Sequence, residues 1–280
     1  MGGAVGKREA SRFILSALTA SPPMDRCLTW STGKSGIRLY RRAPESLEME
    51  MPMADTSAAD VHPPYLYPDY RSTRLRAPAQ PLVRVAPSPL ESVGPTFPQQ
   101  FVRDGEADLT TWGASAPLGE KMVLVGRVLD EDGRPVRGAL VEVWQANASG
   151  KYPHPVDDHD APLDPNFLGK GQVLTDDEGR YRIVTVKPGA YPWGNHAFGW
   201  RPAHIHFSLF GNAYAQRLIT QMFFPGDPLL AIDPIFQSVP EAGRPLLVAD
   251  LDLERGIEGV ALGYRWDLVL RGPRATPMGL

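Results

Sequence analysis

The chain has 280 residues, which is enough for one large domain or two small ones with a substantial core. Its formal net charge of −3 gives no sign of nucleic-acid binding or of attraction to a membrane surface. The single cysteine, Cys27, excludes a disulfide framework and a cysteine-rich zinc site. No apolar run reaches the roughly 18 residues that span a bilayer. We therefore expect a cytoplasmic protein with no nucleic-acid or membrane partner.

Residues 1–52 differ in character from the rest of the chain. Basic residues precede a short apolar stretch, "FILSALTA", which loosely resembles a secretory signal, but Glu9 interrupts the basic region. Met51 and Met53 offer alternative starts just before a more regular sequence. We predict that residues 1–52 are a disordered extension or a mis-assigned start, with a targeting peptide as the alternative.

Residues 53–120 are rich in proline, serine and arginine and show few periodic runs. Aromatic side chains, among them Tyr70 in "YLYPDY" and Phe101 in "PTFPQQF", indicate that this segment packs against something. We predict an extended arm that contacts a partner chain. The alternatives are an arm that wraps the chain's own barrel and a disordered linker.

From Lys121 onward the pattern is that of short strands separated by turn signals. Strands are expected within 121–130, 139–146, 180–186, 204–210, 217–224 and 264–272, and the first two are expected to form a hairpin. A long loop is expected over 147–172, and a short helix within 240–252. Glycine (27) and proline (29) make long helices improbable. The prediction is mainly β: a β-sandwich over 121–280 with long irregular loops and an extended N-terminal arm.

The stretch "WRPAHIHFSLFG" holds the most suggestive pair of side chains. In a strand, His204 and His206 point to the same face, roughly 6.6 Å apart along the strand. Two imidazoles on one face favour a metal site, although two histidines within a core or at the surface remain an alternative. Neither a cysteine nor a carboxylate lies close by in the sequence.

Two groups of side chains could complete such a site. One is the acidic run from Asp157 to Asp160, for which a solvated loop is the simpler interpretation. The other is a pair of loop tyrosines, Tyr152 and Tyr191, each followed by a proline that favours an extended backbone. The residues alone do not choose between tyrosines that bind a metal and tyrosines that only pack.

Five motifs in order, "EVWQANASGKYPH", "LDPNF", "KPGAYPW", "WRPAHIHF" and "LITQMFFPGDPL", resemble the intradiol ring-cleaving dioxygenases, in particular the β-chain type that acts on protocatechuate. The resemblance covers roughly residues 68–272. It implies one ferric ion per chain, with Tyr152, Tyr191, His204 and His206 as ligands. It also implies aromatic catabolism through the β-ketoadipate pathway: O₂ cleaves protocatechuate to 3-carboxy-cis,cis-muconate. Phenolate oxygens suit a hard ferric ion, which can drive off the phenol proton.

The same resemblance assigns roles around the ligands. Tyr191 is the ligand that substrate displaces, while Tyr152 stays. Arg201 stabilises negative charge on the substrate ring, and Gln221 hydrogen-bonds Arg201 or a ligand. Substrate binding is expected at Tyr70, Trp193 and Ile235. Trp144 is expected to pack only, or to support a ligand, and His154, His159 and His196 are expected to be loop residues.

Three alternatives remain. The chain could be an intradiol dioxygenase for catechol or hydroxyquinol, although its irregular arm differs from the helical N-terminal segment of those relatives. It could be a non-catalytic β-sandwich module that binds copper or another ligand through His204 and His206. It could also be the non-catalytic sister chain, which the presence of all four ligand residues disfavours. The resemblance implies that a homologous α chain completes a hetero-oligomer with this chain.

Overall fold

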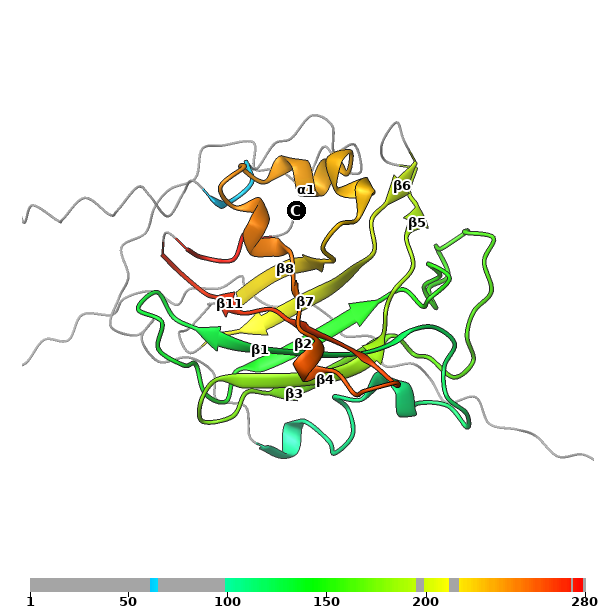
Figure 1. Ribbon diagram of the computed structural model, residues 1–280, viewed down its shortest axis with the longest axis horizontal. Coiled ribbons are helices and arrows are strands. Elements are labelled where there is room, and N and C mark those ends of the chain that lie inside the picture. Colours follow the sequence, from blue (N-terminus) through cyan, green and yellow to red (C-terminus); the bar gives the residue numbers. More distant parts are fainter. Residues whose placement is uncertain (1–60, 65–98, 195–198, 212–216, 273, 279–280) are drawn as a thin grey trace, which may run out of the picture. The chain divides into compact units, whose positions relative to one another are not determined.

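The computed structural model describes residues 61–64, 99–194, 199–211, 217–272 and 274–278 (Figure 1). These residues belong to one compact unit within residues 52–280. The predicted extension, residues 1–52, lies outside the described residues, as does most of the predicted arm, including Tyr70. The division of the chain at residues 52 and 120 therefore stays a prediction.

The first sheet is built around β1 (Lys121–Leu129), its longest strand. One edge of β1 pairs in antiparallel fashion with β4 (Arg180–Val186). The other edge pairs in parallel with β10 (Leu262–Arg265) and then with β11 (Leu268–Val269). The two-residue β9 (Asp250–Leu251) extends the sheet beyond β10.

The second sheet is antiparallel throughout, in the order β3–β2–β7–β8. Its strands are β2 (Leu140–Gln145), β3 (Lys170–Leu174), β7 (His204–Phe210) and β8 (Arg217–Phe223). β7 is an inner strand that pairs with β2 on one side and β8 on the other, so its register is fixed from both edges.

Short elements complete the described structure. A two-stranded ribbon pairs β5 (Tyr191–Pro192) with β6 (Trp200–Arg201). One turn of α-helix, α1 (Pro234–Ser238), follows β8 in the chain. The 3₁₀ segments are η3 (Gln99–Phe101), η4 (Leu109–Thr111), η5 (Pro228–Ala231), η6 (Arg244–Leu247) and η7 (Leu253–Arg255). Within the described ranges, no helix has the length and apolar character that crossing a membrane requires.

The hydrophobic core lies between the two sheets. Met122, Leu124 and Ile183 contribute from the first sheet, and Val141 and Phe207 from the second, all with at most 1 % of their surface exposed. Burial of this apolar surface is the main term that stabilises the sandwich. The predicted mainly-β sandwich of short strands is therefore confirmed.

The predicted hairpin between the first two strands is wrong. β1 and β2 belong to different sheets, and the turn between them carries the chain across the sandwich. Only the connecting segment pairs with β1: Val136 N–H donates to the Val128 carbonyl, and Pro135 forms a bridge with Leu129. Thr175, at the end of β3, then accepts the Ala139 N–H and donates to the Val136 carbonyl, which ties the chain to the second sheet. Alternation of apolar residues does not distinguish a hairpin from such a crossing.

Two other expectations were too coarse. The predicted long loop over 147–172 contains the start of β3, whose five residues pair with β2. The predicted strand over 264–272 is interrupted after Arg265, where the buried Trp266 donates its indole N–H to the Leu246 carbonyl. The predicted helix within 240–252 is the short 3₁₀ segment η6.

The side chains of β7 point alternately to the two faces of its sheet, and only one of these faces contacts the core. Ile205, Phe207 and Leu209 point into the core, so His204 and His206 point to the opposite face. The strand pairing places Trp144 of β2 and Gln221 of β8 on either side of His206. The predicted histidine pair thus lies on a polar face that is backed by the core of the sandwich.

Candidate metal centre

The two histidines of β7 direct ring nitrogens toward each other. His204 Nε2 and His206 Nε2 are 3.2 Å apart, with ring centroids separated by 4.8 Å. Nitrogens at this separation match adjacent ligands of one ion, with bonds of about 2.1 Å meeting at about 100°. The pair therefore has the spacing of two metal ligands.

Hydrogen bonding indicates the tautomer of His204, and burial keeps both histidine rings neutral. His204 Nδ1 lies 2.8 Å from the Pro202 carbonyl, which can only accept, so the proton of His204 is on Nδ1 and Nε2 is bare. Burial, then the nearby charge of Arg201, holds the pKa of His204 well below its usual range. The same causes lower the pKa of His206 to about 3. Both rings are neutral at physiological pH, as metal binding requires.

A tight turn carries Tyr152 toward the histidines. The buried Asn147 organises this turn, because its side-chain oxygen accepts the N–H groups of Ser149 and Lys151, each at 2.9 Å. Asp157 then accepts the backbone N–H of Tyr152 at 2.7 Å. Lys151 Nζ closes the loop by donating to the carboxylate and carbonyl of Asp157 and to the His159 carbonyl. The backbone at Tyr152 and just before it is thus fixed by hydrogen bonds.

A different element positions Tyr191. It lies directly opposite Arg201 in the β5–β6 ribbon. The side chain is half-buried, and its hydroxyl is 3.3 Å from Arg201 Nη1, which donates to it. The two tyrosine rings meet edge to face with centroids 5.4 Å apart, and the Tyr191 ring is 5.4 Å from the ring of His204. The Tyr191 ring therefore lies against both the Tyr152 ring and the His204 ring.

Two glycines allow the tyrosine segments to touch. Gly150, at φ +77°, lies against the Ala190 carbonyl, and a Cβ there would overlap that backbone. Gly189 packs in the same way against the Ala148 carbonyl, and its N–H donates to the Asn147 carbonyl at 3.0 Å. Each glycine precedes its tyrosine by two residues. Only glycine fits backbones at this separation, so both motifs require it.

The Tyr152 hydroxyl has no hydrogen-bond partner among the described residues, although its oxygen is fully buried. Burial, then the proximity of Tyr191, raises the pKa of Tyr152 far above its usual value. A buried hydroxyl without a partner is costly, and in native proteins it calls for an explanation such as an unseen ion. A cation at this point would accept the oxygen as a phenolate and remove the cost. The residues present therefore fit a hard metal ion.

Arg201 connects this cluster to its surroundings. The side chain is only 2 % exposed. Its Nη1 faces Tyr191 and His204 at 3.3 and 3.2 Å, while Nη2 donates to the Gln221 side-chain oxygen at 2.7 Å. Burial opposes the charge, but the Coulombic attraction and hydrogen bonds of Asp233 outweigh it, and the pKa of Arg201 is raised. The cluster thus contains one permanent positive charge.

The structure brings together most of the residues selected from the sequence. Tyr152, Tyr191, His204 and His206 converge, and Arg201 lies against them. Gln221 contacts Arg201, which was one of its two predicted roles. Trp193 places its ring 5.3 Å from the Arg201 guanidinium, and Ile235 is buried in α1. Tyr70 and His196 lie outside the described residues.

The acidic run does not join the cluster. Burial raises the pKa of Asp157, but the N–H groups of Tyr152 and His159 and the Lys151 ammonium outweigh it and hold the pKa below its ordinary value. Asp158 and Asp160 are exposed, as is His154. Within the described ranges, no group of three or more histidine, cysteine or acidic side chains could hold a metal. A centre here depends on tyrosine oxygens.

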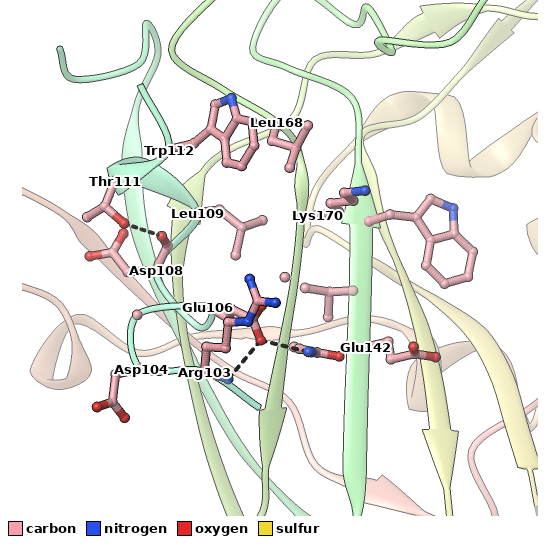
Figure 2. Close-up of a pocket in the computed structure, with 15 residues that line it drawn as sticks. Arg103, Asp104, Glu106, Asp108, Leu109, Thr111, Trp112, Glu142, Leu168 and Lys170 are labelled. Atoms are coloured by element: carbon pink, nitrogen blue, oxygen red, sulfur yellow. Dashed lines mark hydrogen bonds between the residues drawn. The ribbon is translucent and has the colours of Figure 1, made fainter. Parts of the chain in front are cut away.

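Trp144 lies between the cluster and a separate cavity. Its indole stacks on the His206 ring with centroids 4.7 Å apart and planes within 4°. The cavity, of about 820 Å³, is shown in Figure 2, where Arg103, Glu106, Leu109 and Lys170 surround it. None of the four converging side chains lines this cavity. Trp144 therefore supports His206, as one of its two predicted roles required.

Known proteins resemble this chain over most of its length. The sequence profile of the family described as "Dioxygenase" matches residues 93–272, and that described as "Protocatechuate 3,4-dioxygenase beta subunit N terminal" matches residues 57–88. The protocatechuate 3,4-dioxygenase beta chain of Burkholderia cepacia is 57 % identical over 219 residues, covering 78 % of this chain and 93 % of that protein. This chain belongs to the intradiol dioxygenase family.

Two further relatives show the breadth of this dioxygenase family. The protocatechuate 3,4-dioxygenase alpha chain of Burkholderia cepacia is 32 % identical and covers 68 % of this chain and 94 % of its own length. The hydroxyquinol 1,2-dioxygenase of Rhizobium sp. (strain MTP-10005) is 35 % identical, but the match spans about half of each protein, 54 % and 53 %. The chain is thus an intradiol ring-cleaving dioxygenase with greater similarity to the beta chain than to either of these relatives.

Sequence reasoning missed several residues that build the centre. Asn147 shapes the Tyr152 turn, Gly150 and Gly189 allow the two segments to touch, and Asp233 binds Arg201. Asp157 was considered only as a ligand, whereas it accepts the Tyr152 N–H. A signal existed for some of them. Each tyrosine motif has glycine two residues earlier, and "AIDPIF" has the Asp-Pro pattern of a helix start.

Proposed function

We propose that this chain is the β chain of a protocatechuate 3,4-dioxygenase. The reaction would consume O₂ and break the bond between the two hydroxylated ring carbons of 3,4-dihydroxybenzoate. Each of these carbons would gain one oxygen atom, giving 3-carboxy-cis,cis-muconate. The observation that carries the proposal is the buried Tyr152 hydroxyl, which has no hydrogen-bond partner among the described residues and converges with Tyr191 and the Nε2 atoms of His204 and His206. The 57 % identity to a protocatechuate 3,4-dioxygenase beta chain supports the choice of substrate.

One ferric ion per chain would be held by Tyr152, Tyr191, His204 and His206. When bound, it would supply a Lewis acid that chelates both catechol oxygens and makes the ring susceptible to O₂. Two neutral nitrogens and two phenolate oxygens form a hard, anionic donor set, which favours the ferric over the ferrous state. The donor set differs from the two-histidine, one-carboxylate set of ferrous oxygenases.

Tyr191 is the residue that we expect to take a proton from substrate. Its hydroxyl is half-buried and already accepts from Arg201 Nη1, which stabilises a phenolate and would follow the oxygen if it moved. In the part of the chain that the structure describes, no donor reaches the Tyr152 hydroxyl, and Tyr152 is held by its backbone. We assign Tyr191 as the ligand that catechol displaces and Tyr152 as the ligand that remains.

Arg201 would then act on the bound ring. Its guanidinium is buried, charged and fixed on its far edge, so it meets developing negative charge without reorganising. Gln221 holds one nitrogen of the same group. Trp193 and Ile235 would bound the ring pocket, and Tyr70 would contact the substrate carboxylate.

A homologous α chain is the partner that we propose. The support is twofold: the alpha chain of Burkholderia cepacia is itself 32 % identical to this chain, and the loops around the centre expose apolar side chains. Val156 and Trp200 are 80 % and 45 % exposed, and they lie in the loop that follows Tyr152 and in the ribbon that pairs with Tyr191. A related chain docked on these loops would cover them.

The test is to co-express this chain with its α partner and to measure iron, visible absorption and oxygen uptake. We expect one iron per αβ unit, a wine-red colour from tyrosinate-to-iron charge transfer, and oxygen uptake with protocatechuate well above that with catechol. His204→Ala is the control that removes a ligand. Stoichiometric iron in a colourless protein would overturn the ligand set, and preference for catechol or hydroxyquinol would overturn the substrate.

A further inference from the structure

The inference concerns Asp233, a fully buried carboxylate that lies between the candidate metal centre and α1. None of its surface is exposed. Its Oδ1 accepts Arg201 Nε at 2.9 Å, and its Oδ2 accepts Arg201 Nη2 at 3.0 Å. Oδ2 also accepts the Phe236 N–H at 3.0 Å, which makes Asp233 the N-cap of α1. One carboxylate therefore binds two structures that approach the centre.

The two edges of the Arg201 guanidinium have different hydrogen-bond partners. Its Nε and Nη2 are occupied by Asp233 and Gln221, on the side away from the candidate ligands. Its Nη1 alone faces the centre, toward Tyr191 and His204. A two-point contact fixes the plane of a guanidinium, which a single hydrogen bond does not. The direction of Nη1 is thus set by Asp233.

The second structure is the helix that carries Ile235. Asp233 is followed by Pro234 at the first helical position, and its cap to Phe236 holds the start of α1. Ile235 lies one residue further along and is 6 % exposed. Asp233 contacts both Arg201 and the start of α1, so this one side chain determines how Ile235 lies relative to Arg201.

We propose that Asp233 is a positioning residue for the dioxygenase reaction: it orients the guanidinium of Arg201 toward Tyr191 and sets α1 against it. The proposal rests on the function given above for Arg201. Asp233 itself touches neither the candidate ligands nor the space between them in the described contacts. Its effect on the reaction would pass through Arg201.

A second Asp-Pro pair provides a matched control. Asp227 precedes Pro228, caps η5 by accepting the Leu229 N–H at 2.9 Å, and accepts the Ala203 N–H at 3.1 Å. It thus resembles Asp233 in sequence and in capping, but it has no described contact with the Arg201 side chain. Asparagine caps helices about as well as aspartate, so Asp233→Asn and Asp227→Asn both retain a cap. Only Asp233→Asn places a side-chain NH₂ group against the N–H groups of Arg201, where two donors face each other and one hydrogen bond is lost.

The experiment compares both variants with the wild type in the co-expressed complex. For Asp233→Asn we expect kcat per bound iron to fall about 100-fold with KM changed by less than about threefold, because the lost interaction acts in the transition state. We also expect a shift of the resting charge-transfer band, because Arg201 contacts the Tyr191 oxygen. Asp227→Asn should leave the band unchanged and kcat per iron within about twofold.

A merely structural role would reduce the amount of folded, iron-loaded enzyme and leave kcat per iron and the band unchanged, and that result would overturn the proposal. If Asp233→Asn does not fold, the crystal structure of the wild type with protocatechuate decides. Retention of the two-point Arg201–Asp233 contact supports the proposal, and rotation of Arg201 away from Asp233 refutes it. If the wild type does not oxidise protocatechuate, the proposed function fails, while the band shift still tests Asp233.

Discussion

The segments that carry Tyr152 and Tyr191 reach the same point in opposite ways. Tyr152 is held through its backbone, by Asp157 and the Asn147 turn, and its hydroxyl has no described partner. Tyr191 stands on a two-residue strand, and its hydroxyl is held by Arg201. Among the described residues, the first arrangement leaves the oxygen without a partner, which a bound cation would supply. The second provides a charged donor for the oxygen whether or not a cation is bound.

The largest expected effect separates these two roles. Tyr152→Phe should lower iron affinity by more than about 100-fold, because a ligand should cost more than the 10–100-fold typical of supporting residues. Iron content after dialysis and the visible band measure the effect. Tyr181→Phe is the control, since it removes a buried hydroxyl that donates to the Trp266 carbonyl within the core. If the Tyr152→Phe protein kept its iron and its colour, Tyr152 would not be a ligand, and the proposed difference between the two tyrosines would be wrong.

Tyr191→Phe is expected to act on turnover more than on iron. Because substrate is expected to displace this ligand, most of the iron should stay bound, the charge-transfer band should move, and kcat should fall about 100-fold. Rapid-mixing absorption with protocatechuate would show slower binding of the dianion. The distinction between the two tyrosines would be wrong if this variant lost iron as readily as Tyr152→Phe.

Gly150→Ala tests whether the two segments depend on each other. The added Cβ would meet the Ala190 carbonyl at a backbone already at φ +77°. We expect a loss of about 3 kcal/mol in the free energy of unfolding, together with weakened iron binding. Gly138→Ala is the matched control, because φ is +65° with no atom within 4 Å, and it should cost about 1 kcal/mol. Equal losses in the two variants would show that the contact between the segments is unimportant.

The smallest effect is expected from Asp157→Asn. The variant keeps one acceptor for the Tyr152 N–H but weakens the bond to the Lys151 ammonium. Iron affinity should fall about tenfold, as for other residues that orient a ligand. Asp158→Asn, at the exposed neighbouring position, should change nothing in the same titration. If Asp158→Asn lowered iron affinity more than Asp157→Asn does, the claim that Asp157 orients Tyr152 would be wrong.

The sequence predicted the parts of this molecule that depend on regular alternation. The two faces of β7 follow from the spacing of His204, Ile205, His206 and Phe207, since a strand has only two faces. Tyr152 and Tyr191 came from resemblance, because phenols in loops have no periodicity that marks them as ligands. Asp233 and Asn147 were missed because short polar residues beside prolines and turns are common, and only the fold shows which of them are buried.

The pairing of strands was harder to predict than the strands themselves. β1 and β2 have the lengths and alternation of a hairpin, yet Thr175 directs the second strand to the other sheet. That choice depends on a residue 36 positions from its partner Ala139. Such long-range contacts decide topology and leave no trace in a local pattern.

The inner position of β7 has a consequence for how a bound ion could change. His204 and His206 are separated by one residue on a strand that both neighbours pin in register, so their spacing cannot relax independently of the sheet. Tyr191 stands on a two-residue ribbon, which is easier to displace. A change in ionic radius or coordination number would therefore be accommodated by the phenol side of the centre. His204 and His206 would stay in place while the phenol side moved.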